Sequence, residues 1–137
     1  MRARVGAGAR RRLPTVGLLA SLARALAQPV APPAAADDLP QRRITIHGTE
    51  PKLHVFGVRG RVEGAWAEKR VTVQRKNCRR CGWFAWRTVR TDDDKRYAAP
   101  VRAPAKPGVA CYRVKVRATR HWAVSRSSAV CLVTRRL

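Results

Sequence analysis

Apolar and polar side chains alternate with a period of two through most of the chain from Gln41 onward, which is the spacing of β-strands that bury one face. The clearest run covers residues 110–117, where Tyr112, Val114 and Val116 would face a core and the residues between them would face outward. No stretch of this region sustains a 3.6-residue period. The pattern therefore predicts an all-β domain.

Short alternating runs recur at intervals that suit a two-sheet domain. They cover residues 43–47, 53–59, 70–75, 84–91, 97–102, 110–117 and 128–134, and turn-rich segments at 77–82, 92–95 and 104–108 separate several of them. Seven short strands within residues 41–137 are typical of an antiparallel β-sandwich. We therefore predict an Ig-like antiparallel β-sandwich of about seven strands, occupying residues 41–137.

A series of motifs gives this domain a family resemblance. Val-Thr-Val-Gln-Arg at 71–75 precedes a Trp-containing strand at 86–92, a turn with Lys95 and Tyr97, and Pro-Gly followed by Tyr-Arg-Val-Lys-Val at 107–116. The order resembles the Ig-like and carboxypeptidase-regulatory-like β-sandwich modules of secreted bacterial proteins, over residues 53–134. The resemblance implies a fold and specifies no activity. Lys95 stands where the family has a turn glycine, so it must tolerate any positive φ that the turn needs.

The four cysteines are an even number in a short chain, which is typical of a disulfide framework in an oxidising compartment. Cys78 and Cys81 flank a two-residue hairpin tip, close enough to bridge each other. Pairing the last two strands about His121 sets Cys111 opposite Cys131. We therefore predict these two disulfides. A zinc site would need a second closely spaced pair of ligands, which Cys111 and Cys131 do not form. A redox-active Cys-x-x-Cys motif would need a helix N-terminus to lower the thiol pKa, so both alternatives are less favoured than structural disulfides.

The N-terminus has the parts of an export signal. Five arginines within residues 1–12 precede an apolar stretch at 13–23 and then small residues, which predicts a signal peptide at 1–27, cleaved after 27 or as late as 36. The apolar stretch is too short to span a membrane, and residues 28–40 form a Pro/Ala-rich spacer. We expect secretion, to the outside or the cell envelope. The alternative is an arginine-rich arm that stays attached.

The net charge of +22, from 30 Lys and Arg against 8 Asp and Glu, favours anionic partners. The alternative is a compositional bias, because most of the excess is arginine. Strand alternation predicts an outward basic face that carries a tryptophan, suited to polyanion contact and cation–π pairing. Its predicted members are Arg79, Arg80, Trp86, Arg90, Arg113, Lys115, Arg117 and Arg135.

Residues suited to catalysis do not form a recognisable group in this sequence. His47, His54 and His121 have no metal-binding spacing, the serines lack a nucleophile elbow, and the acids at 92–94 are consecutive. We therefore expect no enzyme, cofactor or metal. The sequence predicts a secreted, strongly basic, disulfide-stapled binding module that contacts an anionic cell-envelope polymer or a protein, and nucleic acid only non-specifically. The alternatives are an intracellular nucleic-acid-binding protein that uses the arginine-rich arm, and an accessory or inhibitory domain of a secreted enzyme.

Overall fold

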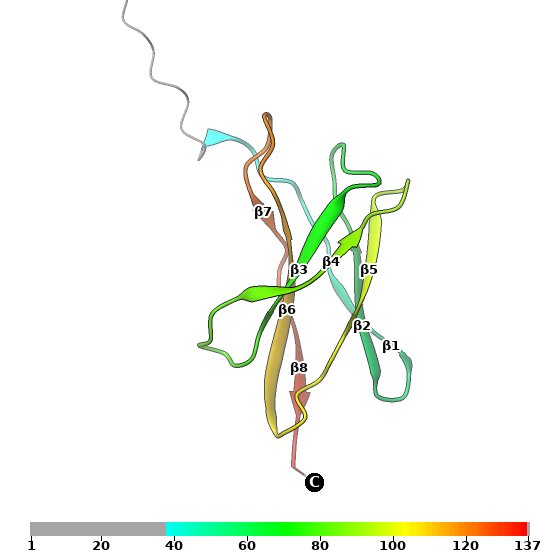
Figure 1. The fold of residues 1–137 in the computed structure, drawn as a ribbon, viewed down its shortest axis with the longest axis vertical. Coiled ribbons are helices and arrows are strands. Elements are labelled where there is room, and N and C mark those ends of the chain that lie inside the picture. Colours follow the sequence, from blue (N-terminus) through cyan, green and yellow to red (C-terminus); the bar gives the residue numbers. More distant parts are fainter. Residues whose placement is uncertain (1–37, 137) are drawn as a thin grey trace, which may run out of the picture. The chain divides into compact units, whose positions relative to one another are not determined.

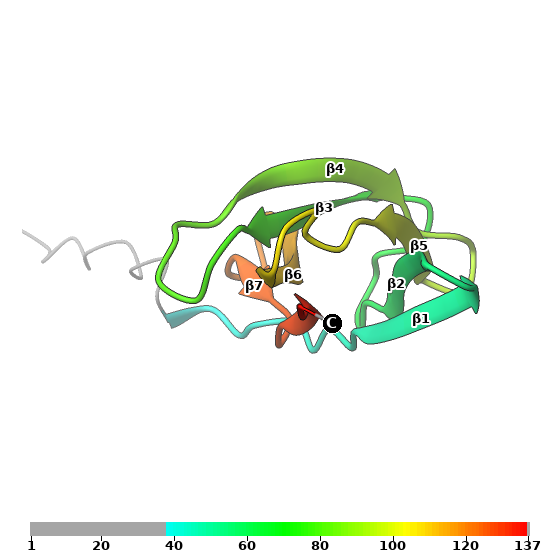
Figure 2. The same ribbon diagram turned by 90° about the horizontal axis from the view of Figure 1, so that it is seen from below.

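A computed structural model describes residues 38–136, and it contains two antiparallel β-sheets that face each other (Figures 1 and 2). The strands are β1 (His47–Lys52), β2 (Val55–Arg61), β3 (Arg70–Lys76), β4 (Phe84–Arg90), β5 (Arg96–Val101), β6 (Gly108–Val116), β7 (Ser125–Arg126) and β8 (Val130–Thr134). One sheet has the order β1-β2-β5, and the other has the order β4-β3-β6, with β7 and β8 both paired to β6. The predicted all-β sandwich is confirmed. The predicted signal peptide and residues 28–37 of the spacer lie outside the described residues.

The core lies between the two sheets and follows the alternation of the sequence. Tyr112, Val114 and Val116 on β6 are fully buried, as predicted, and Val73 on β3 packs in the same cluster. Val58 on β2 closes the core from the smaller sheet. Removing this apolar surface from water is the main force that holds the two sheets together.

The last predicted strand, residues 128–134, corresponds to β8, and the short strand β7 that precedes it was not predicted. β8 pairs with β6 in the predicted register, but β7 is shifted by one residue. Ser127 occupies the break. Its Oγ accepts a hydrogen bond from Val114 N at 2.8 Å, and its backbone N donates to Val114 O at 2.9 Å. The serine side chain therefore replaces a backbone partner at the irregular point of the ladder.

The predicted strands at 43–47 and 53–59 are displaced in the structure. Ile44 is buried and forms an isolated bridge to Val62, but the continuous ladder begins only at β1. Leu53, 79 % exposed, lies in the turn between β1 and β2, so the second strand starts later than predicted. Alternation predicted the apolar positions here, but it could not predict where the backbone hydrogen bonds between the strands begin and end.

The segment before β1 runs from one sheet to the other (Figure 1). Pro40 O accepts a hydrogen bond from Ala123 N at 3.0 Å, and Arg42 N donates to Ser125 Oγ at 2.7 Å. Both partners belong to the β7 side of the larger sheet, whereas β1, from His47 on, belongs to the smaller sheet. These few residues therefore connect the two layers along one side of the sandwich.

The side chain of Arg42 is the most unusual feature of this connection, because it is only 5 % exposed. Its guanidinium carbon lies 4.7 Å from the ring centroids of both Trp66 and Trp122. Nη2 donates to Thr119 Oγ1 at 3.3 Å, while Nε and Nη1 have no hydrogen-bond partner. A Cβ atom at Gly64 would lie 2.7 Å from Nη1, so the site needs glycine there. Burial lowers the pKa of Arg42, and the two ring faces stabilise its charge.

The turn between β4 and β5 contains Lys95 at φ 65°, in the left-handed region. Lys95 N donates to Asp92 O at 3.1 Å, and Lys95 O accepts from Val62 N at 3.0 Å. Arg96 N donates to Asp92 Oδ1 at 2.8 Å. The turn therefore has a positive φ that glycine would adopt most easily, and hydrogen bonds on both sides hold lysine in it.

Replacing Arg42 by alanine should lower the free energy of unfolding by about 2–4 kcal/mol, because it removes the desolvated cation–π contacts and leaves a cavity between two rings. The neighbouring R43A variant is the control, since Arg43 is exposed, and it should stay within about 0.5 kcal/mol of the wild type. Urea unfolding measures both. Equal losses in the two variants would contradict a structural role for the stack.

Replacing Lys95 by glycine should raise the free energy of unfolding by about 0.5–1 kcal/mol, because relief of the left-handed strain exceeds the extra entropy of glycine in the unfolded chain. D94G is the matched control. Asp94 is not among the positive-φ residues of the described chain, so glycine there should destabilise the fold. Thermal unfolding of the two variants checks the sign, and a lower melting temperature for K95G would refute the argument.

Candidate anion-binding face

Two disulfides have the predicted pairing. Cys78 bonds to Cys81 across the β3–β4 hairpin tip, and Cys111 on β6 bonds to Cys131 on β8. Cys111 and Cys131 are direct partners in the β6–β8 register, as symmetry about His121 predicted. All the cysteines are oxidised in the structure, so none is available as a thiolate ligand for zinc. Such disulfides are typical of an extracellular or otherwise oxidising environment.

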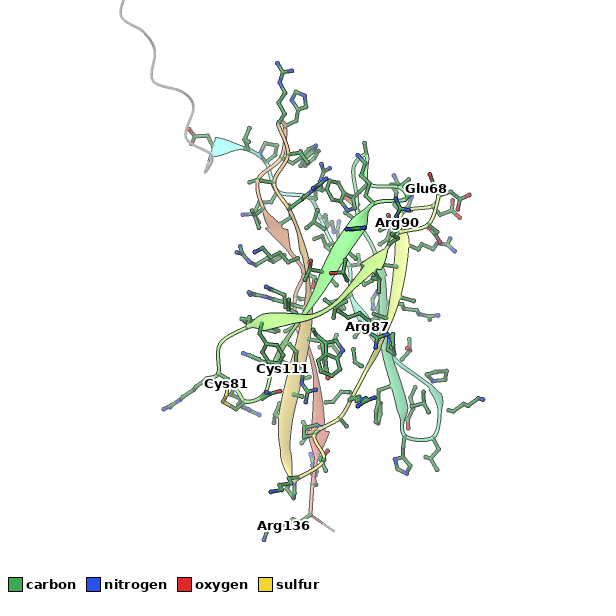
Figure 3. The ribbon with its side chains drawn as sticks, viewed as in Figure 1. Glu68, Cys81, Arg87, Arg90, Cys111 and Arg136 are labelled. Carbon is green, nitrogen blue, oxygen red and sulfur yellow. A yellow bond between two sulfur atoms is a disulfide. The ribbon has the colours of Figure 1, made fainter. Side chains whose placement is uncertain are left out.

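The outward residues at one end of the larger sheet enclose a hollow of about 560 Å³, here called the basic hollow. Three of its lining residues, Arg90, Lys115 and Arg117, belong to the predicted face, and the hollow brings them together. Figure 3 shows Arg90 and Glu68 at this end of the sandwich. The full lining is Glu68, Lys69, Arg70, Thr72, Thr88, Arg90, Lys115 and Arg117. Five cations therefore face one carboxylate, with two threonine hydroxyls between them.

The strand register places like charges directly opposite each other on this face. Arg70 on β3 pairs with Arg90 on β4, and Lys115 on β6 pairs with Arg126 on β7. Like charges in direct cross-strand positions destabilise a sheet. Bound anions would remove that repulsion, so the arrangement suits a face that meets a negatively charged partner. We call Arg70, Arg90, Arg113, Lys115, Arg117 and Arg126 the basic face.

The aromatic residue of this face is Trp83, whose position the sequence left open. The guanidinium carbon of Arg113 lies 4.2 Å from the Trp83 ring centroid, and Lys76 Nζ lies 5.0 Å from it. Arg113 Nε also donates to Gln74 Oε1 at 2.8 Å. Burial and then the charge of Arg126 lower the pKa of Arg113. Arg113 is therefore held in place between a ring and an amide.

The predicted outward position of Trp86 is wrong. Trp86 packs against the core cluster, lies edge-on to Tyr112 with centroids 6.1 Å apart, and donates from Nε1 to Pro100 O at 3.4 Å. The register of β3 and β4 shifts between Val73 and Gln74, because β4 carries one extra residue there. Such a bulge reverses the alternation beyond it, so a prediction that started from Val89 assigned Trp86 to the wrong face.

Other predicted members of the face lie away from the basic hollow. Arg79 and Arg80 are exposed at the disulfide-closed hairpin tip, and Arg135 is exposed after β8. Thr134, the residue before Arg135, pairs with Gly108 at the start of β6, whereas Arg117 follows the end of that strand. Lys69, Arg70 and Arg126 were not among the predicted residues; alternation along β3 is consistent with an outward Arg70, but its place opposite Arg90 needs the strand register.

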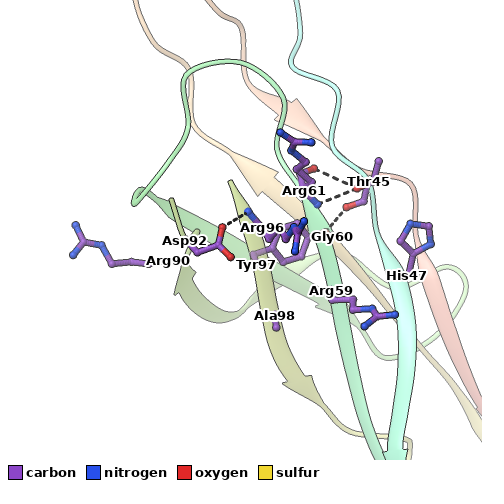
Figure 4. A pocket seen from close by; sticks show the side chains of 10 residues that line it. All are labelled: Thr45, His47, Arg59, Gly60, Arg61, Arg90, Asp92, Arg96, Tyr97 and Ala98. Atoms are coloured by element: carbon purple, nitrogen blue, oxygen red, sulfur yellow. Dashed lines mark hydrogen bonds between the residues drawn. The ribbon is translucent and has the colours of Figure 1, made fainter. Parts of the chain in front are cut away.

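A second basic hollow of about 600 Å³ lies on the smaller sheet (Figure 4). Its lining includes His47 and the charged residues Arg59, Arg61, Arg90, Asp92 and Arg96. The strands approach closely at Gly60, where a Cβ would lie 1.9 Å from Thr45 O. Tyr97 OH donates to the same oxygen at 2.6 Å, and burial raises the pKa of Tyr97. Four arginines face one carboxylate in this hollow, against five cations and one carboxylate in the first, so this hollow is the less basic of the two.

No protein-family model, curated protein or solved structure matches the chain. The resemblance to secreted bacterial sandwich modules therefore stays a prediction from sequence motifs. Within residues 38–136, no helix is long and apolar enough to span a membrane. In the same residues, no group of three or more His, Cys, Asp or Glu side chains is placed to hold a metal ion.

Graded reduction should open Cys78–Cys81 before Cys111–Cys131. Both residues of the first pair are exposed, whereas in the second pair Cys131 is exposed but Cys111 is only 2 % exposed, so a thiolate has fewer accessible sulfurs to attack there. Native protein is treated with increasing dithiothreitol, trapped with iodoacetamide and mapped by peptide mass. Alkylation of Cys111 and Cys131 at or below the concentration that modifies Cys78 would show that burial does not protect the second disulfide.

Proposed function

We propose that the chain is a secreted, non-catalytic binding module that holds an anionic cell-envelope polymer against its basic face. The observation that carries the proposal is the register that sets Arg70 opposite Arg90 and Lys115 opposite Arg126. A purely compositional arginine bias would not need to concentrate unfavourable pairs around one hollow. The threonine hydroxyls of the hollow add neutral donors beside the charges, which suits phosphate or carboxylate groups.

Several features support a module that positions rather than transforms its partner. The two disulfides tie the strands that carry the face, and Arg113 is fixed by Trp83 and Gln74. A rigid array of cations loses little conformational entropy when it binds a repeating polymer. The resemblance to secreted bacterial sandwich modules and the predicted signal peptide point to the same compartment as the disulfides.

The alternative is an intracellular nucleic-acid-binding protein that acts through its arginine-rich arm. That hypothesis places the binding residues upstream of residue 38, whereas the proposal places them on the sheet. The disulfides favour the proposal, because cytosolic thiols are normally kept reduced. Weak, salt-sensitive binding to nucleic acid is expected of either protein, so affinity for DNA alone does not separate them.

The proposal predicts that removing four charges from the basic hollow weakens polymer binding more than removing four charges elsewhere. The site variant is R70Q/R90Q/K115Q/R117Q, and the control is R43Q/K106Q/R120Q/R136Q, whose four side chains are exposed and lie outside the basic hollow. Both variants lose the same charge. With poly(glycerol phosphate) as the probe, the site variant should bind at least about tenfold more weakly than the control.

Isothermal calorimetry at several salt concentrations measures both variants. The slope of log affinity against log salt should fall in magnitude by about two to four for the site variant and by less for the control. Equal losses in the two variants would show that only net charge matters, and would favour the compositional explanation. Urea unfolding of each variant verifies that a loss of binding is not a loss of fold.

A further inference from the structure

A third hollow, of about 720 Å³, differs in character from the two basic ones. Its walls are mainly apolar and include Phe56, Trp86, Pro100 and Pro104, and two arginines, Arg87 and Arg102, line it as well. It lies where β5 ends, whereas the second basic hollow lies where β5 begins. Figure 3 shows Arg87 at a different level of the sandwich from Arg90. We call it the apolar hollow.

The bulge in β4 creates one wall of the apolar hollow by turning Trp86 toward the smaller sheet. Three contacts hold the ring there: Tyr112 lies edge-on at 6.1 Å, Pro100 O accepts from Nε1 at 3.4 Å, and the Arg75 guanidinium carbon lies 4.7 Å from the ring centroid. Arg75 Nε is buried without a hydrogen-bond partner. The ring is therefore fixed before any ligand arrives.

A second part of the lining is held through Arg102. Tyr112 OH donates to Arg102 O at 2.6 Å and accepts from Arg102 N at 3.1 Å, so one buried tyrosine positions both the backbone of Arg102 and the ring of Trp86. Pro104 O accepts from Thr134 Oγ1 at 2.7 Å, which anchors the end of this part of the lining to β8. Proline and hydrogen-bonded backbone make the hollow largely preformed, as small-molecule sites usually are.

The lining specifies the chemistry of an occupant. Apolar rings and prolines suit an aromatic or branched aliphatic body, and the volume is within the range of sites for small molecules. Arg87 and Arg102 are both exposed, and none of the lining residues in the described chain is acidic. A single negative group on the ligand would therefore meet two guanidinium groups and no opposing carboxylate.

We propose that the apolar hollow is a binding site for small amphipathic anions, with an apolar body against Trp86 and Phe56 and a carboxylate or sulfonate between Arg87 and Arg102. The site is independent of the basic face, and it selects a single charge on an apolar body rather than a repeating polymer. The ring of Trp86 is the reporter, since its indole N–H lies beside the hollow.

The test uses 2-naphthoate as the probe, with uncharged 2-naphthalenemethanol for comparison, in a 1H–15N titration of the full folded domain with its disulfides intact. Of the indole signals from Trp66, Trp83, Trp86 and Trp122, that of Trp86 should shift saturably. R87Q/R102Q should bind naphthoate about tenfold or more weakly, while R43Q/R136Q, with two exposed arginines outside the hollow, should match the wild type. The alcohol should bind all three proteins weakly and equally.

A second variant, A103W, fills the hollow from its lining and should abolish the Trp86 shift while leaving the urea midpoint near that of the wild type. The quadruple variant of the basic hollow should keep naphthoate binding, which separates this proposal from the function proposed above.

Equal weakening by the two arginine pairs, a shift at Trp83 instead of Trp86, or no saturation would overturn the proposal. So would a concentration-dependent dimer that blocks the probe, because it would assign the hollow to a second copy of the chain.

Discussion

The burial of one cation, Arg42, between Trp66 and Trp122 is the constraint on which much of the sandwich depends. Arg42 belongs to the short segment that joins the larger sheet through Ser125 before the chain enters the smaller one. Its side chain is packed where an apolar residue would ordinarily close a core. Because Nε and Nη1 have no hydrogen-bond partner, the rings and the Thr119 hydroxyl must offset the desolvation of the charge. The fit of both layers therefore depends on this electrostatic contact as well as on apolar packing.

The same interaction recurs wherever a tryptophan lies in the described chain. Lys69 lies over Trp66, Arg75 over Trp86, and Lys76 and Arg113 over Trp83, at distances from 4.2 to 5.2 Å. Proteins contain about one significant contact of this kind per 70–80 residues. A chain with 30 basic and 8 acidic residues has too few carboxylates to pair its cations. Aromatic faces therefore serve as the main partners of the cations that the fold brings inward.

The sequence was sufficient to predict features that depend on alternation and symmetry alone. The inward positions of Tyr112, Val114 and Val116 follow from a period of two, and the Cys111–Cys131 pairing follows from reflection about the last hairpin. Features that depend on an interruption of the pattern could not be predicted. The extra residue in β4 reversed the face of Trp86, and local alternation carries no signal for a bulge.

Arg42 illustrates a different limit, because nothing in the local sequence signals that this arginine is buried. An arginine before a strand is normally solvated, and only the positions of Trp66 and Trp122, 24 and 80 residues away in the chain, make it a core residue. The basic hollow was found in part, since Arg90, Lys115 and Arg117 follow from alternation. Its extent was missed because Arg70 becomes a member only once β3 is known to lie between β4 and β6.

The division of the arginines between positions covered by aromatic rings and positions on the outer surface changes how the net charge of +22 should be understood. Arg42 and Arg75 lie against aromatic rings, so their guanidinium groups are turned away from a partner at the surface. Those on the outward side, set opposite one another by the strand register, have no such cover and repel each other. Their surroundings therefore separate the arginines into structural and surface groups, although their residue type is the same. A polyanion would interact with the second group, and its affinity would follow the arrangement of that group more than the formal charge of the chain.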